Sequence, residues 1–289
     1  MGNCLCCVTE TEEIRVALKL PNGLTGLNYN QSSKSFVPID NIDIWIKSLY
    51  LDSSWTGWIV YNDETAHIDI KGTTKGHCKG ILAWNKEHIS WLIHSVPNFP
   101  RLFTGNTISD IEKGEHIFGQ SFCYTKLSYT DKLLHDIVNH IAIMEAHMYI
   151  LQVDVQIPKA TKTQTVQSIT FSDKISHHVK SPYAHIDIYS EYLCGKDQAV
   201  WNVETWKRGS KITKACKNIQ DIETLKFAGN EYKESQDHSK WAISEELCFI
   251  GDLNRMESQS KRGGGGILIR DPDMAGAFRK LIHEVIIKF

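Results

Sequence analysis

Two short segments, far apart in the chain, carry the same triplet of residue types. His77-Cys78-Lys79 and His238-Ser239-Lys240 each place a histidine two residues before a lysine. Side chains on an extended strand alternate with period two, so each triplet can aim an imidazole and an ammonium at one spot. Two such pairs that face each other would surround one anionic centre with two histidines and two positive charges. Phosphodiester cleavage by a histidine nucleophile and a histidine acid needs this set of groups.

Length and composition allow a large hydrophobic core, and the net charge depends on the pH. The chain has 289 residues, of which 42% are apolar, enough for one large domain or for two of about 140 residues. A formal net charge of −2 indicates no strongly basic face at neutral pH. The 13 histidines would add positive charge between roughly pH 7.5 and 5.5, which would favour a polyanionic substrate at acid pH. The alternative is that histidines are merely common in this chain, and composition alone leaves both interpretations open.

The N-terminus begins Met-Gly-Asn-Cys-Leu-Cys-Cys and contains no long apolar segment typical of a secretory signal. Gly2 followed by Cys4, Cys6 and Cys7 resembles an N-myristoylation site with palmitoylation partners, although Cys6 stands where Ser or Thr is preferred. Dual acylation would attach the chain to a membrane. The alternatives are a disordered N-terminus and a start codon assigned too far upstream. We therefore expect a cytoplasmic or membrane-attached protein from this segment.

The remaining cysteines are scattered without the spacing of a zinc site or of a disulfide framework, which favours free thiols in a reducing compartment. They are Cys78, Cys123, Cys194, Cys216 and Cys248.

The elements around the triplets are predicted from periodicity. Strands are expected over 14–20, 58–62, 81–84, 89–94, 148–155, 199–206, 240–244 and 248–251. Helices are expected over 129–146 and 274–287, and 183–192 is compatible with helix or strand. The polar stretch 159–174 is expected to be a loop between two halves. Antiparallel pairing of 81–84 with 89–94 would bring His94 beside the first triplet.

A glycine run follows two cations in Lys261-Arg262-Gly263-Gly264-Gly265-Gly266. It precedes an expected strand over 267–269, and its backbone N–H groups with Lys261 and Arg262 could bind phosphate. It is not a P-loop, because no Gly-Lys-Ser/Thr follows. The alternative interpretation is a flexible surface loop.

These segments together resemble the deoxyribonuclease II family of the phospholipase D superfamily. The specific matches are GHCKGILAW, WLIHSVPNFP, FGQSF, DHSKWAIS and IGDLNR followed by KRGGGG, and the weaker ones are VALKLPNG, GLNYN, IVYND and VWNVETW. The resemblance implies an α/β fold: a pseudo-dimer of two mixed-sheet halves with flanking helices and one active site at their junction. We predict a flexible tail over 1–12, one half over 13–158 and the other over 159–289.

The resemblance also implies an activity. The family cleaves DNA at acid pH without metal or other cofactor, through a phosphohistidine, and leaves 3′-phosphate ends. Transferred to this chain, His77 is the predicted nucleophile and His238 the general acid, with the reverse assignment open. Lys79 and Lys240 would stabilise the charge of the transition state. His94 with Ser95, and Asp252 with Asn254, stand where the superfamily has residues that orient the catalytic groups.

Two departures from the family concern the cellular compartment in which the protein acts. Secreted relatives have a cysteine directly after HSKW, where this chain has Ala242, and they carry a signal peptide. The family implies a lysosome or another acidic vesicle, whereas the N-terminus here indicates a cytoplasmic or membrane-attached protein. Two other functions remain open: a phosphodiesterase acting on phospholipid, and an inactive nucleic-acid-binding homologue. The two intact triplets argue against the inactive homologue. The sequence does not give the oligomeric state.

Overall fold

The computed structural model describes residues 13–51, 54–65, 76–160, 162–207, 212 and 216–286. The predicted tail and the acylation candidates Gly2, Cys4, Cys6 and Cys7 lie outside the described residues. Among the helices that are described, none has the length and apolar character needed to cross a membrane.

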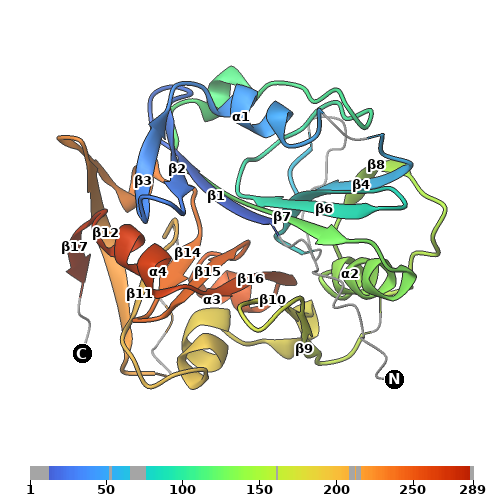
Figure 1. The fold of residues 1–289 in the computed structure, drawn as a ribbon. Helices are drawn as coiled ribbons and strands as arrows, with labels where there is room; N and C mark the ends of the chain where they lie inside the picture. Colours follow the sequence, from blue (N-terminus) through green and yellow to red (C-terminus); the bar gives the residue numbers. More distant parts are fainter. Residues whose placement is uncertain are drawn as a thin grey trace, which may run out of the picture.

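Two large β-sheets form the molecule (Figure 1). The first has the order β3 (Ser35–Ile39), β2 (Gly26–Asn30), β1 (Glu13–Lys19), β7 (Gln120–Ser128), β6 (His88–His94), β5 (Lys79–Trp84), β4 (Gly57–Asn62) and β8 (Met148–Gln152). The second has the order β13 (Asn230–Lys233), β12 (Ile219–Phe227), β11 (Trp201–Glu204), β14 (Trp241–Ile243), β15 (Leu247–Gly251), β16 (Gly264–Arg270), β10 (Ile175–Lys180) and β9 (Val166–Thr170), with β17 (Ile282–Ile286) also on β12.

The two sheets repeat one another. Strands β4, β5, β6, β7 and β1 are neighbours in that order, and β11, β14, β15, β16 and β10 follow the same order in the second sheet. The expected pseudo-dimeric α/β fold of two sheet halves is therefore confirmed. Only the second sheet is mixed, because β11 and β12 run parallel while the pairings described in the first sheet are all antiparallel.

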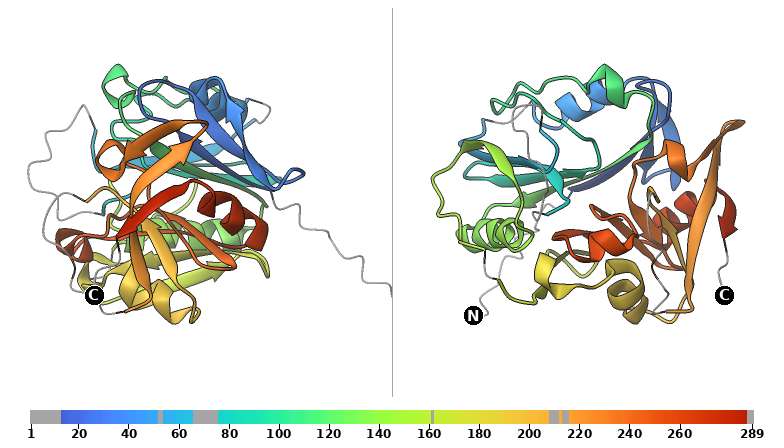
Figure 2. Two further views of the ribbon diagram at one scale, coloured as in Figure 1. Left: turned by 90° about the vertical axis from the view of Figure 1, so that its left-hand side faces the viewer. Right: turned by 180° about the vertical axis from the view of Figure 1, so that it is seen from behind.

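One apolar core fills the space between the sheets. Val16 and Trp91 of the first sheet share it with Val179 and Trp241 of the second. Helices α2 (Asp131–Ile143) and α4 (Pro272–Arg279) pack into this core, and Figure 2 shows them from two further sides. Helix α2 contacts β9 and β10, while α4 contacts β3, β14 and β15. Each helix therefore packs against strands of the other half, and separating the halves would expose apolar surface.

The outer faces of the sheets are covered by shorter elements. Helix α1 (Ile42–Ser48) covers the first sheet, and the π-helical turn η3 (Ile188–Tyr192) covers the second. The other short helices are η1 (Lys113–Glu115), η2 (Pro182–Ala184), η4 (Leu193–Gly195), η5 (Glu234–Gln236) and α3 (Glu257–Ser260).

Two expectations about secondary-structure elements and one about the cysteines are corrected. The helix predicted over 274–287 ends at Arg279, because the β-branched residues that follow pair with β12 as β17. The polar stretch 159–174 contains β9, which pairs with β10 at the sheet edge. Two cysteines expected as free thiols, Cys194 and Cys216, form a disulfide because the turns that carry them meet beside β11 and β12. Cys78, Cys123 and Cys248 are free and buried.

Candidate active site

The first triplet lies at the start of β5, in the junction between the halves. The side chains of His77 and Lys79 are directed to one side, while Cys78 between them faces the core, as period-two alternation predicts. Lys79 forms an ion pair with Asp63, which follows β4, the strand paired with β5. A second carboxylate, that of Glu64, lies 3.8 Å from the Lys79 ammonium. Both Lys79 and Asp63 are buried, so the ion pair is largely shielded from solvent.

The His77 ring is held by the other half of the protein. Its Nδ1 lies 2.8 Å from the main-chain carbonyl oxygen of Asp252. A carbonyl oxygen only accepts, so Nδ1 carries the proton and Nε2 keeps its lone pair. Burial lowers the pKa of His77 well below its ordinary value; Asp63 opposes this, whereas Lys79 and Lys240 reinforce it. The surroundings of His77 therefore favour its neutral imidazole form.

The second triplet lies just before β14 and meets a carboxylate of the first half. His238 Nδ1 is 3.7 Å from Glu115 Oε2. Its ring stacks on Phe118 at 4.0 Å between centroids and also contacts Trp206 at 4.5 Å. Burial raises the pKa of Glu115 to about 7, and nearby Glu64 adds to the shift. A carboxylate beside a histidine favours the protonated imidazole, which suits a general acid.

The two triplets border the same space. Lys240 is close enough to His77 to lower its pKa, and Lys79 acts in the same way on Lys240. Burial, the larger cause, lowers the pKa of Lys240 to about 8, so its ammonium stays charged at neutral and acid pH. Glu115, which faces His238, lies within the field of Lys79. Two imidazoles and two ammoniums thus gather at the junction of the halves.

Reciprocal main-chain hydrogen bonds fix this arrangement. The His77 N–H donates to the Gly263 carbonyl at 2.8 Å, and the His238 N–H donates to the Gly119 carbonyl at 2.8 Å. Gly119 and Gly263 directly precede the equivalent strands β7 and β16. Each triplet is therefore attached to the other half at the corresponding point of the repeat.

The supporting residues also form equivalent pairs. Ser121 N–H donates to Ser95 Oγ at 2.9 Å, and Gly265 N–H donates to Asp252 Oδ2 at 3.2 Å. Burial raises the pKa of Asp252 to about 7. Ser95 also donates to Gln120, which in turn donates to Glu115.

The two remaining supporting candidates, His94 and Asn254, are also buried. His94 accepts a hydrogen bond from the Val96 N–H at 3.2 Å and stacks against Phe122. Asn254 is buried, and its Oδ1 accepts no hydrogen bond within the part of the chain that is described. Their orienting roles stay predictions.

The glycine run is tightly packed. Gly264 already belongs to β16, and a Cβ on Gly263 would lie 2.1 Å from the Met144 carbonyl oxygen. Gly263 and Gly264 are buried: Gly263 lies against Met144 of the other half, and Gly264 lies against Leu253 of its own half. Their role in phosphate binding stays a prediction.

The two cations before the glycines differ in position. Lys261 is exposed at the end of α3. Arg262 reaches across the junction and donates to Asp63 Oδ2 at 2.9 Å and to the Gly76 carbonyl at 3.0 Å. Arg262 therefore secures the segment that leads into His77.

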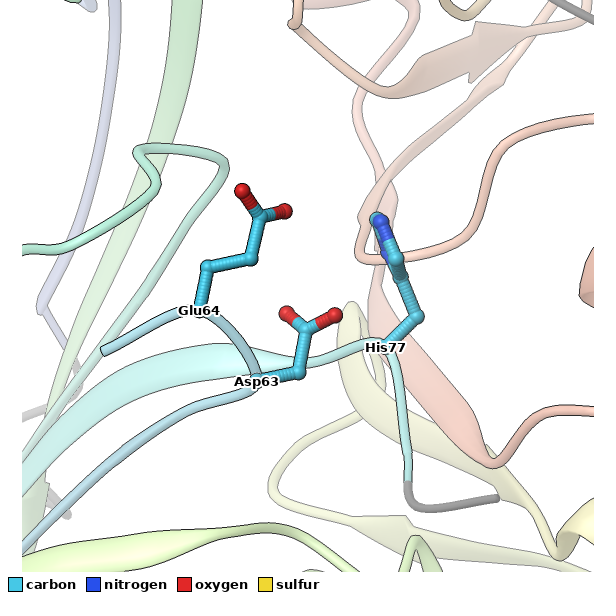
Figure 3. Close-up of side chains that lie close together, drawn as sticks. All are labelled: Asp63, Glu64 and His77. Carbon is cyan, nitrogen blue, oxygen red and sulfur yellow. The ribbon is translucent and has the colours of Figure 1, made fainter. Parts of the chain in front are cut away.

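Three carboxylates of this site were missed in the sequence. Asp63 ends the IVYND segment, so its position after a strand was a usable signal, whereas Glu64 in a loop and Glu115 at the end of η1 carry none. Figure 3 shows that Asp63, Glu64 and His77 lie close together, with their ligand atoms within 4.8 Å of one another. The oxygens of Asp63 already face Lys79 and Arg262, so a divalent cation would have to compete with two fixed positive charges.

A pseudo-dimeric α/β fold with one histidine-lysine triplet per half defines a class of phosphodiester-cleaving proteins. The deoxyribonuclease II family model matches residues 39–286, and the chain belongs to this family. It is a nuclease of the deoxyribonuclease II type.

Curated relatives cover most of the chain. Cell-death-related nuclease 7 of Caenorhabditis elegans is 28% identical over 81% of this chain and 70% of its own length. Deoxyribonuclease-2-alpha of Sus scrofa is 27% identical over 81% of this chain and 71% of its own length. Plancitoxin-1 of Acanthaster planci is 25% identical over 78% of this chain and 70% of its own length.

Proposed function

We propose that the chain is an endonuclease that hydrolyses DNA phosphodiesters at acid pH without a metal, through a phosphohistidine on His77, and leaves 3′-phosphate ends. One observation carries the proposal: each half holds the histidine of the other by a main-chain hydrogen bond, of His77 to Gly263 and of His238 to Gly119. This reciprocal attachment directs both triplets to a common space between the halves.

In the first step, the Nε2 lone pair of His77 attacks phosphorus. The bond between phosphorus and the 5′-oxygen breaks, and that oxygen takes a proton from His238. The product is a phosphoramidate that links His77 Nε2 to the 3′-phosphoryl group of the DNA. Asp252 supports this step, because its carbonyl accepts the Nδ1–H and so stabilises the imidazolium that forms.

In the second step, His238 takes a proton from water, and the resulting hydroxide attacks phosphorus. The phosphorus–nitrogen bond breaks, His77 recovers its lone pair, and a 3′-phosphate is released. His238 thus changes from acid to base, and one water is consumed per bond cleaved.

The two lysines have different surroundings, which indicates different shares of the charge stabilisation. When the triplets are aligned, Trp206 in the second half occupies the position of Asp63 in the first. Lys79 is paired with Asp63, whereas the Lys240 ammonium donates to the carbonyl of His238 at 2.5 Å. We propose that Lys240 contributes more to neutralising the phosphoryl oxygens, since no carboxylate of the described residues forms an ion pair with it.

Acid pH suits this site for two reasons. His77 remains neutral there, because its pKa is well below the ordinary value. Glu115 and Asp252, each with a pKa of about 7, take up protons as the pH falls below neutral. Fewer negative charges then surround the phosphate, which strengthens its attraction to Lys240 and Lys79.

The test is cleavage of plasmid DNA by the wild type, His77→Ala and His238→Ala at pH 5 and pH 7.5, each with and without EDTA. We expect both variants to lose at least about 10³-fold in kcat and EDTA to have no effect. His135→Ala is the matched control, because His135 is an exposed histidine on α2. Near-normal turnover by either site variant would refute the two-histidine scheme, and loss of activity on chelation would refute metal independence.

A second assay isolates the covalent step. A 3′-labelled nucleotide ester with 4-nitrophenol in place of the 5′-nucleoside needs no acid to release its leaving group. We expect His238→Ala to accumulate the label on His77, since hydrolysis of the intermediate lacks its base. Label that appears on no histidine would exclude the phosphohistidine. Vesicles of phosphatidylcholine in a parallel assay distinguish a lipid phosphodiesterase.

A further inference from the structure

Two buried lysines outside the triplets occupy equivalent positions in the two halves. Lys19 ends β1 and Lys180 ends β10, which are corresponding strands of the repeat. Their exposed fractions are 1% and 0%. Full burial of a lysine is costly, so each side chain needs a specific set of acceptors.

Lys19 binds main-chain oxygens of the loop that leads into β7. Its ammonium donates to the carbonyls of Leu20 at 3.1 Å, His116 at 3.0 Å and Phe118. The last two belong to the loop that also carries Glu115. A single ammonium thereby fixes both ends of the short segment 116–118.

Lys180 does the same for the loop that leads into β16. Its ammonium donates to the carbonyls of Ser260 at 2.8 Å and Arg262 at 2.5 Å. Neither Lys19 nor Lys180 forms an ion pair with the residues that the structure describes. Carbonyl oxygens are thus their direct partners, and more distant carboxylates only add to the field.

Each of these two loops holds the catalytic histidine of the other half. The loop fixed by Lys19 supplies the Phe118 ring against His238, the Glu115 carboxylate at its Nδ1, and the Gly119 carbonyl that accepts its N–H. The other loop, which Lys180 fixes, supplies the Arg262 guanidinium and the Gly263 carbonyl on the side of His77.

We propose that Lys19 and Lys180 are positioning residues, each fixing the loop of its own half that aligns the catalytic histidine of the other half. The inference rests on the proposed function for its kinetic consequence. Its structural consequence, a crossed dependence of His238 on Lys19 and of His77 on Lys180, is independent of the reaction.

The positive charges of Lys19 and Lys180 are part of their positioning role. Burial lowers the pKa of both lysines to about 8, so both remain ammoniums at neutral and acid pH. An ammonium can serve two or three carbonyls at once, which a neutral side chain of similar size cannot. An apolar residue would fill the same space without the desolvation cost, but it would leave those carbonyls without a donor.

The test compares Lys19→Met and Lys180→Met, which keep the length of the side chain and remove the donors. We expect kcat for DNA cleavage to fall by about 10- to 100-fold with KM changed by less than about 3-fold, since misplaced groups impair chemistry more than binding. The histidine Cε1–H signals, assigned with His77→Gln and His238→Gln, give a readout without catalysis. Lys19→Met should shift the His238 signal and leave that of His77 in place, and Lys180→Met should do the opposite.

A control separates positioning from loss of stability. Thr224→Val removes a part-buried hydrogen bond from Thr224 on β12 to Glu284 on β17, away from the junction, and should lower the melting temperature without moving kcat or either histidine signal. If the methionine variants do not fold, Lys19→Gln and Lys180→Gln, which keep a neutral donor, are measured in the same way. Lysine variants that, like Thr224→Val, lower the melting temperature but leave kcat and both histidine signals unchanged would overturn the proposal. A wild type that does not cleave DNA would instead refute the proposed function, and the crossed shifts would still decide the role of the lysines.

Discussion

The Nδ1 atom of His77 lies 2.8 Å from the main-chain carbonyl oxygen of Asp252, a residue of the opposite half. The ring is thus oriented by backbone, and its tautomer does not depend on the side chain at position 252. Since the Asp252 carboxylate accepts instead from the Gly265 N–H, the two functions of this residue can be separated by substitution.

Asp252→Asn should change how stability depends on pH. The pKa of Asp252 in the folded protein, about 7, lies above the ordinary 3.8. The neutral carboxyl is therefore favoured in the folded state, and the stability it contributes is present below about pH 4 and is lost as the pH rises toward 7. Asparagine cannot ionise, so relative to wild type the variant should gain on the order of 1–3 kcal/mol in unfolding free energy on going from pH 5 to pH 8. Urea denaturation at both pH values measures this, and an equal difference at pH 5 and pH 8 would contradict it.

Glu115→Gln should shift the pH dependence of kcat toward acid. The carboxylate faces His238 Nδ1 and stabilises its protonated form. Because the pKa of Glu115 is about 7, this charge is present above neutral pH and is lost in acid. The substitution should therefore lower kcat at and above neutral pH and leave kcat unchanged in acid, so the pH at which kcat is half-maximal should fall, by up to about one pH unit. Glu112→Gln is the control, since Glu112 pairs with Arg101 at the surface. A profile of Glu115→Gln that overlays the wild type would show that Glu115 does not assist His238.

Much of this site could be predicted from the sequence, and the missing part has a common cause. The triplets mark the residues proposed as catalytic, and strand periodicity indicates that His77 and Lys79 share a face. Contacts between halves leave no periodic signal, so the pairing of Arg262 with Asp63 and the attachment of His77 to Gly263 were not predictable. The same holds for elements at the sheet edges: periodicity alone assigns β17 to the end of a helix, because its alternation is short and only its pairing with β12 defines it.

Asp63→Asn should destabilise the protein. Its carboxylate, buried against Lys79 and Arg262, has a pKa held below the ordinary value by these two cations, chiefly Lys79, although burial opposes this. Removing the anion leaves two cations facing each other, at a cost of about 3 kcal/mol. Glu64→Gln is the matched control: Glu64 is 53% exposed and 3.8 Å from Lys79, so its loss should cost less than about 1 kcal/mol. Equal effects of the two variants would show that the ion pairs of Asp63 contribute nothing beyond surface electrostatics.

Gly263→Ala tests whether the glycine run serves packing. A methyl group there would lie 2.1 Å from the Met144 carbonyl oxygen, and a backbone atom cannot turn aside as a side chain can. The halves would have to separate locally, so the variant should lose at least about 2 kcal/mol of stability and weaken the attachment of His77. Gly276→Ala is the control, because Gly276 lies in α4 with no atom within 4 Å of the new methyl, and alanine there should stabilise the helix by up to about 1 kcal/mol. A Gly263→Ala variant with wild-type stability but weaker DNA binding would instead support the phosphate-binding loop.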